Sequence, residues 1–306
     1  MALFAIRRFG RLILTAYIIS TVVFLILRVI PGDPAEVIAG IDASTEDILK
    51  IRERLGTDVP ILEQYGKWLW DILHLRFGSS FMSDQPVGRL ILERFPLTLS
   101  LAMMGLCISM LIAIPLGVLS AVHRWSLWDY VGLAVTQVGM AIPSFWLAIL
   151  LLLVFAVKLK LFPIFGAGSI SHLVLPALSL GLARAAVLLR LTRTSMSFEM
   201  DREYIITARS KGLPESMVRY KHALKNALLP IITVAGIQLG YMLGGSIIIE
   251  QVFSLPGVGR LLLFAVYQRD FPLIQGGVIF VAIAFSFVNF IVDLLYSIVN
   301  PKIRIS

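Results

Sequence analysis

The chain alternates long apolar runs with polar stretches, and six of the runs are long enough to cross a lipid bilayer. A helix needs about 20 apolar residues to span a hydrocarbon core of ~30 Å. The fourth run is short and contains Arg184. The pattern predicts an all-α integral membrane protein with six transmembrane helices, at residues 12–30, 97–122, 130–157, 173–189, 231–252 and 276–299.

The first run follows Arg7, Arg8 and Arg11, as the apolar core of a secretory signal peptide would. It is longer than such a core, and no small-residue cleavage pattern follows it. We interpret it as an uncleaved transmembrane helix.

Prolines and glycines mark particular positions inside the runs. Pro115, Pro143 and Pro176 predict kinks, because proline removes a hydrogen bond of the helix. Ser144, beside Pro143, is a candidate for lining a pathway.

Three glycines of the fifth run, Gly236, Gly240 and Gly244, recur every four residues. This spacing places them on one helix face and lets another helix approach closely. We expect a tight helix interface here rather than direct contact with a substrate.

The composition agrees with a membrane protein, and the distribution of Lys and Arg predicts which side of the membrane each polar stretch faces. Of 306 residues 58% are hydrophobic and 15% charged, and the mean hydropathy is +0.87. These values exclude a soluble globular domain. Lys and Arg gather before the first run and between the fourth and fifth, which predicts cytoplasmic termini by the positive-inside rule. The same rule explains the net charge of +8 without a nucleic acid or an anionic lipid as partner.

The polar stretch 31–96, predicted to be external, contains its own helix signals. Ser44 can cap a short amphipathic helix that Gly56 ends, and a second helix is expected around residues 62–73 with Trp68. We expect a small cap on the membrane, which either docks a soluble partner or packs over the spans.

The stretch between the fourth and fifth runs is too long for a simple connection. We expect one helix over about 197–211, a stop at Gly212, and a new helix that begins near Pro214. The second helix is amphipathic, and such a helix lies in the lipid interface, packs on its own protein or inserts into a partner's groove. Its apolar face holds Leu213, Met217, Tyr220, Leu224 and Leu228, while Arg219, Lys221 and Lys225 lie elsewhere.

Motifs for catalysis or metal binding are missing from the sequence. There is no G-x-x-x-x-G-K-[ST] phosphate loop, so we expect no ATPase site and no enzyme activity. The four histidines are scattered, and Cys107 is the only cysteine, so no metal site and no intrachain disulfide are expected.

The polar stretch between the fourth and fifth runs resembles a signature of permeases of the ABC importers for dipeptides, oligopeptides, nickel and glutathione. Ala208, Gly212 and the pair Leu229 and Pro230 stand where that family has its Glu-Ala-Ala, Gly and Leu-Pro residues. Ile206 and Thr207 depart from the signature, because Glu and the first Ala would be there. Further similar stretches cover the chain in order: Arg28 with residues 31–34 (PGDP), 77–80 (FGSS), 95–99 (FPLTL), Glu250, Val252, Phe253, Pro256, Gly257, Gly259, Arg269, Asp270, Pro272, Asn289, Asp293, Tyr296, Asn300 and Pro301.

The resemblance implies a type I importer permease in the bacterial inner membrane, which binds no cofactor itself. Its partners would be a homologous second permease, two ATP-binding subunits that use ATP and Mg²⁺, and an external solute-binding protein. It implies a cytoplasmic amino-terminus with the first span at 1–30, a cap 31–96, a five-helix core 97–299 with a coupling segment 195–229, and a tail 300–306. The helix after Pro214 would be the coupling helix seated in an ATPase groove, with these coupling residues: Ala208, Gly212, Leu213, Pro214, Met217, Arg219, Tyr220, Lys221 and Leu224.

Polar groups inside the runs have two interpretations. Asn289 and Asp293 lie four residues apart, and we expect an internal hydrogen-bonded role. Arg184 either extends its side chain toward the cytoplasm or lines the pathway and attracts a peptide carboxylate.

The sequence favours a permease for small peptides and leaves other classes open. A permease of the same family for nickel or another small solute is the alternative. A stand-alone secondary transporter is the next alternative. It would show internal repeats and charges near the bilayer midplane, which are not clear in this sequence. A channel or receptor subunit would need a filter or a signalling domain.

Overall fold

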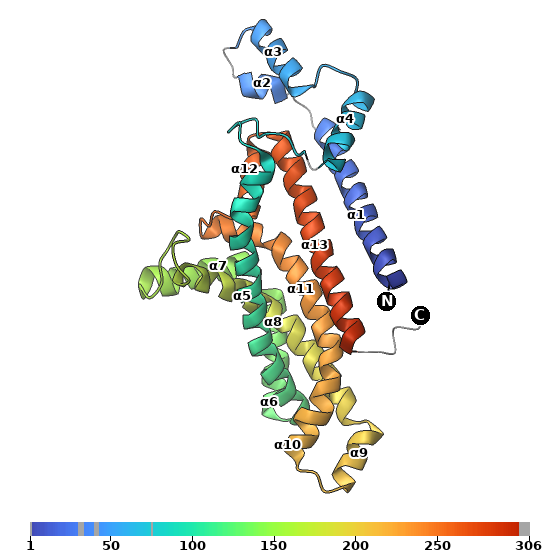
Figure 1. The fold of residues 1–306 in the computed structure, drawn as a ribbon. Coiled ribbons are helices and arrows are strands. Elements are labelled where there is room, and N and C mark those ends of the chain that lie inside the picture. The colour runs from blue at the N-terminus through green and yellow to red at the C-terminus, as the bar shows by residue number, and fades with distance from the viewer. Residues whose placement is uncertain (1, 30–33, 40–42, 75, 300–306) are drawn as a thin grey trace. The chain divides into compact units, whose positions relative to one another are not determined.

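The computed structural model describes residues 2–29, 34–39, 43–74 and 76–299, and helices make up most of these residues. Of the expected motif residues, 31–33, Asn300, Pro301 and the side chains of Asp293 and Tyr296 lie outside the described residues. The helices are α1 Ala2–Val29, α2 Pro34–Ala39, α3 Thr45–Leu55, α4 Ile61–Leu73, α5 Val87–Val122, α6 Leu127–Ala141, α7 Ser144–Leu151, η1 Leu152–Lys158, α8 Ser171–Met200, α9 Glu203–Ser210, α10 Glu215–Met217, η2 Val218–Leu224, α11 Lys225–Val252, α12 Val258–Tyr267 and α13 Phe271–Val299 (Figure 1).

Four stretches of the described chain are long and apolar enough to cross a membrane: α5, α8, Glu215–Gly244 and Phe271–Val292. A fifth results if α6 and the helix Ser144–Lys158 count as one bent span. The apolar stretch of α1, Ile13–Val29, is shorter. The predicted all-α, multi-pass membrane class is confirmed, and the number of six spans stays a prediction.

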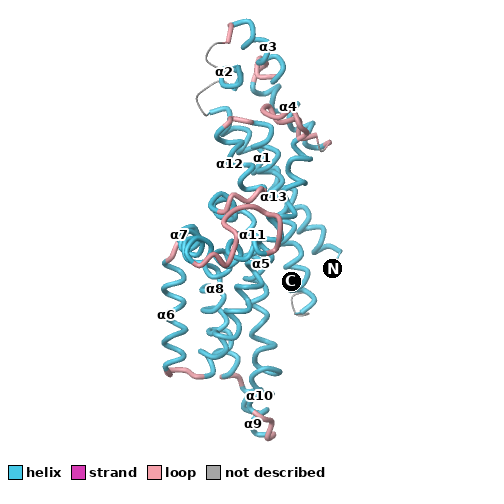
Figure 2. The backbone as a smooth tube through the Cα atoms, turned by 90° about the vertical axis from the view of Figure 1, so that its left-hand side faces the viewer, coloured by secondary structure: helices cyan, strands magenta, loops and turns pink. Residues whose placement is uncertain are grey.

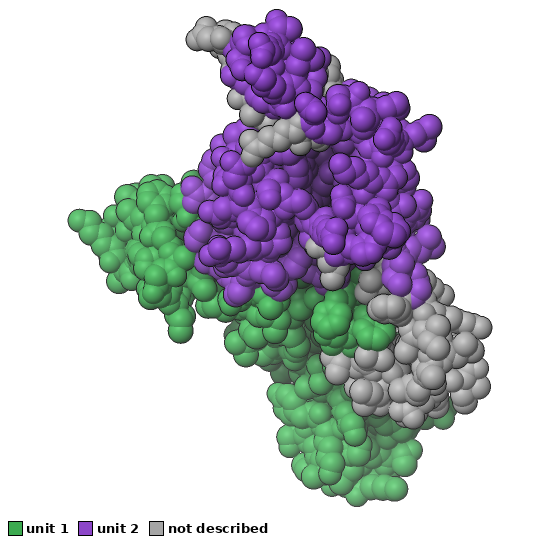
Figure 3. Space-filling model, turned by 45° about the horizontal axis from the view of Figure 1, so that its top comes forward, with its two compact units in different colours: residues 1, 98–255, 285–306 green, residues 2–97, 256–284 purple. Residues whose placement is uncertain are grey.

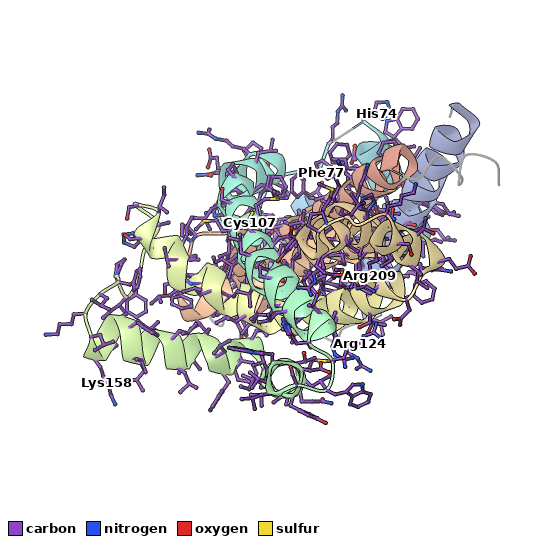
Figure 4. The ribbon with its side chains drawn as sticks, turned by 90° about the horizontal axis from the view of Figure 1, so that it is seen from below. His74, Phe77, Cys107, Arg124, Lys158 and Arg209 are labelled. Carbon is purple, nitrogen blue, oxygen red and sulfur yellow. The ribbon has the colours of Figure 1, made fainter. Side chains whose placement is uncertain are left out.

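The third predicted span is broken rather than straight. Its two halves, α6 and Ser144–Lys158, are bent by 99°. Pro143 has no N–H to donate and drives Ile142 into an extended conformation at φ −83° and ψ 120°. The predicted kink at Pro143 is confirmed, and it turns α7 away from the direction of α6 (Figure 2). Figure 4 shows Lys158 at the end of the helix Ser144–Lys158, far from Arg124 in the turn before α6.

The chain divides into two compact units, shown in different colours in Figure 3. Unit 1 consists of residue 1 with residues 98–255 and 285–306, and unit 2 of residues 2–97 and 256–284. Helices α5 and α13 contribute residues to both units.

In unit 2, α4 packs on the carboxyl-terminal half of α1. Phe24 of α1 is fully buried and meets the rings of Tyr65 and Trp68 at 5.2 and 5.0 Å. The hydroxyl of Thr21 lies 2.9 Å from that of Tyr65. The expected helix α3 is also present, since Ser44 accepts from the Asp47 N–H and Gly56 ends the helix at φ 64°.

Two stretches that carry the family resemblance meet in unit 2 at Asp270. Its carboxylate is 1% exposed and accepts hydrogen bonds from the Ser80 hydroxyl at 2.5 Å, the Phe81 N–H at 3.2 Å and the Leu273 N–H at 3.3 Å. Asp270 thereby caps α13 and fixes the loop before α5. Pro272 lies 3.9 Å from the position that a Cβ would take on Gly78, whose φ is 71°.

Replacing Asp270 by alanine should destabilise unit 2, because three donors would lose their acceptor in a buried place. We expect the free energy of unfolding to fall by about 1–3 kcal/mol. Limited proteolysis during heating checks this, because the loop around Ser80 should become cleavable at a lower temperature. Ser79→Ala, at the exposed neighbouring hydroxyl, should leave that resistance unchanged. Equal behaviour of the two variants would contradict the role given to Asp270.

In unit 1, α8 packs against α6, α7 and α11. At the base of α6, the Asp129 carboxylate is 2% exposed and lies 2.6 and 2.8 Å from the guanidinium of Arg193 on α8. It also accepts from the Ser120 hydroxyl at 2.6 Å and from the Trp125 N–H at 3.1 Å. One buried carboxylate thus joins the end of α5, the turn and α6 to α8.

A second buried carboxylate joins two further stretches of the family resemblance. Glu250 near the end of α11 is fully buried. Its Oε1 accepts from the Thr98 hydroxyl of α5 at 2.7 Å and from the Ser246 hydroxyl at 3.0 Å. Because a buried carboxylate is tolerated only with such donors, these contacts fix α5 against α11.

Candidate functional site

The stretch from the end of α8 to η2, residues 201–224, forms a helical hairpin beyond the ends of α8 and α11 (Figures 1 and 2). The expected helix over 197–211 is wrong at its beginning, since α8 continues to Met200 and α9 begins at Glu203. Arg202 at the break is extended, with φ −77° and ψ 148°. The stop at Gly212 is confirmed, because this residue has a φ of 73°, which glycine adopts readily.

The inner side of the hairpin packs on the rest of unit 1. Ile205 and Ala208 of α9 are 0 and 7% exposed and join a buried cluster with Val218 and Ala223 of η2. Met196 of α8 belongs to the same cluster. Ala208, expected to be a coupling residue, therefore seats α9 against η2 and offers little surface to a partner.

Ion pairs fasten α9 to α10 across the turn at Gly212. Arg209 lies 2.7 Å from Glu215, which also lies 3.3 Å from Arg219. The hydrogen bond to Glu215 raises the pKa of the Arg209 guanidinium above its ordinary value. Sequence reasoning missed this bridge, although opposite charges on either side of a helix stop were its signal.

The base of the hairpin is tied to α8 and to the turn before α6. Arg124 lies 3.0 Å from Asp201 and donates to the Ser197 carbonyl. The Tyr204 hydroxyl donates to Glu199 at 2.5 Å and accepts from Asn226 at 3.0 Å. These contacts tie the beginning of α9 to α8 and α11, and the ion pair of Arg209 with Glu215 ties its end to α10.

The chain runs from α10 through η2 into α11 without a break. Pro230 lies inside α11, so one helix continues from the expected coupling segment 195–229 into the expected fifth span. Residues 218–224 form a π-helix, in which each turn holds more residues than in an α-helix and side chains shift around the axis.

The apolar face expected from α-helical spacing is divided between two surroundings. Leu213 and Leu224 pack against the unit's own cluster. Met217 and Tyr220 are 37 and 62% exposed. Leu213 and Leu224 are half-buried in these contacts, and their role as coupling residues stays a prediction.

The outer side of the hairpin presents apolar side chains to the surroundings. Ile206, Met217 and Tyr220, which we name the hairpin apolar set, are exposed. Lys221 and Pro214 are exposed as well. Large apolar groups among charges are typical of a protein interface, where the apolar groups bind and the charges surround them.

Two of the three glycines expected at a helix interface, Gly236 and Gly240 of α11, lie against α13 in unit 1. A Cβ on Gly236 would overlap the side chain of Val292, and one on Gly240 would lie 2.6 Å from the ring of Phe285. The predicted close approach is confirmed at these two positions. At Gly244 no atom of the described chain lies within 4 Å of the added Cβ.

Alanine at Gly236 or at Gly240 should force α11 and α13 apart and lower the free energy of unfolding by about 1–3 kcal/mol. Gly244→Ala is the matched control, and it should be neutral or slightly stabilising because alanine favours a helix over glycine. Thermal unfolding of the purified permease in detergent checks both. The close approach would be contradicted if all three variants melted alike.

Arg184 lies in α8 beside α11. Its Nη1 donates to Oε1 of Gln238 at 3.2 Å, and its guanidinium carbon lies 5.7 Å from the centre of the Tyr241 ring. Gln238 is 5% exposed, whereas Tyr241 is 55% exposed. Both contacts place the Arg184 guanidinium against α11. Ser144, the other candidate for the pathway, is half-buried at the start of α7.

Family models match almost the whole chain. Residues 113–305 match the model described as "Binding-protein-dependent transport system inner membrane component". Residues 1–102 match the amino-terminal model of the same transport-system membrane components.

Full-length relatives carry related names. A protein of Brucella abortus (strain 2308) named as a peptide transport system permease is 41% identical over 312 residues, with 99% of each chain covered. The glutathione transport system permease protein of Salmonella typhi is 40% identical over 301 residues, with 98% of each chain covered.

Solved structures share the fold. The methionine ABC transporter MetNI, in an inward-facing conformation, matches with a TM-score of 0.60 at 20% identity, covering 69% of this chain and 96% of that one. An amino acid ABC transporter solved with histidines matches with a TM-score of 0.52 at 17% identity, covering 69% and 92%. The chain therefore belongs to the family of binding-protein-dependent transport system inner-membrane components, the permease subunits of ABC importers.

Proposed function

We propose that this permease forms half of the translocation pathway of an importer of small peptides in the bacterial inner membrane. The observation that carries the proposal is the 41% identity over 99% of both chains with a protein named as a peptide transport permease. The relative named for glutathione supports the same substrate class, because glutathione is itself a tripeptide. An external solute-binding protein would deliver the peptide, and a homologous permease would form the other half.

The hairpin of residues 201–224 would be the docking element for one of two ATP-binding subunits. Its exposed apolar set, Ile206, Met217 and Tyr220, would insert into a groove of that subunit. Lys221 and the paired Arg219 would lie at the polar rim. ATP and Mg²⁺ would act in the partner, and closure of the two ATP-binding subunits would push on the hairpin.

The transport assay decides between peptide and other solutes. The permease with its partner subunits is reconstituted in vesicles with ATP inside, and uptake of labelled trialanine and glutathione is measured with the binding protein outside. We expect ATP-dependent uptake of at least one peptide, with no competition from nickel. Uptake of nickel in place of peptide would refute the proposed substrate class, and uptake without ATP would indicate a secondary transporter.

Arg184 is the candidate cation of the pathway, where it would attract the carboxylate of a passing peptide. Arg184→Gln should lower peptide uptake about tenfold, which corresponds to one lost charged hydrogen bond. Arg190→Gln, at an exposed arginine of the same helix, is the matched control. Unchanged uptake by Arg184→Gln would leave Arg184 with a structural role toward Gln238.

A further inference from the structure

Unit 2 contains a cavity of about 630 Å³ that is separate from the hairpin and from the candidate pathway residues. Its walls come from the carboxyl-terminal end of α1, from α3 and α4, from the loop before α5, and from the first turns of α13. Figure 3 shows the surface of this unit in purple, with a hollow in it. The volume is that of a site for a small organic ligand.

Two buried hydrogen-bond donors line this cavity without a partner among the described residues of the chain. Gln275 is 6% exposed, and its Nε2 has no acceptor there. Arg28 donates through Nε and Nη2 to Oε1 of Gln64 at 3.3 and 3.1 Å, whereas its buried Nη1 has no acceptor there. Buried polar atoms are almost always satisfied, so these two indicate an occupant with acceptor oxygens.

The contacts of the Arg28 guanidinium fix its position and leave one N–H for such an occupant. Its guanidinium lies 3.8 Å from the centre of the Phe24 ring, and this ring is held in turn by Tyr65 and Trp68. A guanidinium with a fixed plane and a free N–H suits a carboxylate, which accepts hydrogen bonds from the arginine fork. The Gln275 amide adds a donor for a carbonyl or a second carboxylate oxygen.

The remaining lining suits the other end of a zwitterion. Exposed Lys67 and Arg76 also line the cavity. The carboxylates of the lining outnumber these cations and include Glu53, Asp58 and Glu63, which are exposed, and Asp71, which is half-buried. They offer acceptors for an ammonium group. Trp68 and Phe271 add apolar wall for short side chains. Buried donors with exposed acids therefore match a ligand that carries a carboxylate at one end and an ammonium at the other.

We propose that this cavity binds a short peptide, with the free carboxylate at Arg28 and Gln275 and the ammonium at the acidic lining. The choice of a peptide over another zwitterion rests on the proposed function. The cap region would then hold peptide on the permease itself, in addition to the external binding protein.

Binding is measured on the assembled transporter in nanodiscs without the binding protein, by equilibrium dialysis with labelled trialanine and with its carboxyl-terminal amide. We expect saturable binding of trialanine, and binding of the amide about tenfold weaker because a charge-assisted hydrogen bond is lost. Arg28→Gln and Gln275→Leu should each weaken trialanine binding and remove the preference for the free acid. Arg89→Gln, at an exposed arginine of unit 2 that does not line the cavity, is the matched control and should bind as the unchanged protein does.

Three results would overturn the proposal: no saturable binding, equal binding of the acid and the amide, or unchanged preference in both variants. Arg28→Lys guards against a folding defect, since it keeps the charge without the fork and should bind with intermediate strength. The uptake assay is separate. Peptide import without binding in the cavity would refute this site alone, and failure of import would refute the proposed function whatever the cavity binds.

Discussion

Met217→Asp should separate the permease from its ATP-binding subunit while the permease stays folded in the membrane. Met217 is exposed on the hairpin, so aspartate fits without strain, but a carboxylate would be buried in the partner's apolar groove. Loss of an apolar anchor together with burial of a charge weakens an interface by about a hundredfold or more. Copurification of the ATP-binding subunit and ATP-dependent uptake should both be lost.

The control for this experiment is Leu161→Asp, which makes the same kind of change at an exposed leucine in the loop between η1 and α8. It should keep the ATP-binding subunit. Tyr220→Asp should behave like Met217→Asp. If Met217→Asp and Tyr220→Asp both copurify with the ATP-binding subunit and support uptake, the hairpin is not the coupling element.

Arg193→Met should be the most damaging change to folding among the ion pairs described. It leaves the Asp129 carboxylate, which is 2% exposed, without its cation. Breaking a buried pair in this way destabilises a protein by about 3–5 kcal/mol. The thermal midpoint of the purified permease in detergent should fall markedly.

The matched control is Arg124→Met, which breaks the pair with Asp201, whose side chain is 67% exposed. Exposed pairs contribute about 0–1 kcal/mol, so this variant should melt close to the unchanged protein. The double variant Arg193→Met with Asp129→Leu should recover some of the loss, because no unpaired carboxylate remains. A larger shift for Arg124→Met than for Arg193→Met would contradict the importance given to burial.

Local signals in the sequence predicted much of the helix pattern. Pro143 predicted the break between α6 and α7, and Ser44, Gly56 and Gly212 predicted helix ends, because each acts through its own backbone or side chain. The break at Arg202 has no glycine or proline to mark it. The π-helix of residues 218–224 was missed as well, since it changes the helix period on which the expected apolar face depends.

Contacts between distant residues could not be derived from spacing. Ser80 and Asp270 are 190 positions apart, and each was noted only as a member of a family motif. Gly236, Gly240 and Gly244 give the same sequence signal, yet in the described chain Gly236 and Gly240 lie against α13 and Gly244 does not. Which glycine meets a neighbour depends on where that neighbour crosses, and the cavity beside Arg28 likewise exists only once separate segments have come together.

Helices α10, η2 and α11 form one unbroken helix from Glu215 to Val252, which approaches α13 closely at Gly236 and Gly240. Gly236 lies 19 residues after Met217 and 16 residues before Val252, and the second of these parts is ~24 Å long at the α-helical rise of about 1.5 Å per residue. If α11 tilts about its close contact with α13 at Gly236, the parts of the helix on either side of that contact are similar in length. A push that tilts the Met217 end one way would swing the end beside Glu250 the opposite way by a similar distance, so that one side of the membrane would open as the other closed.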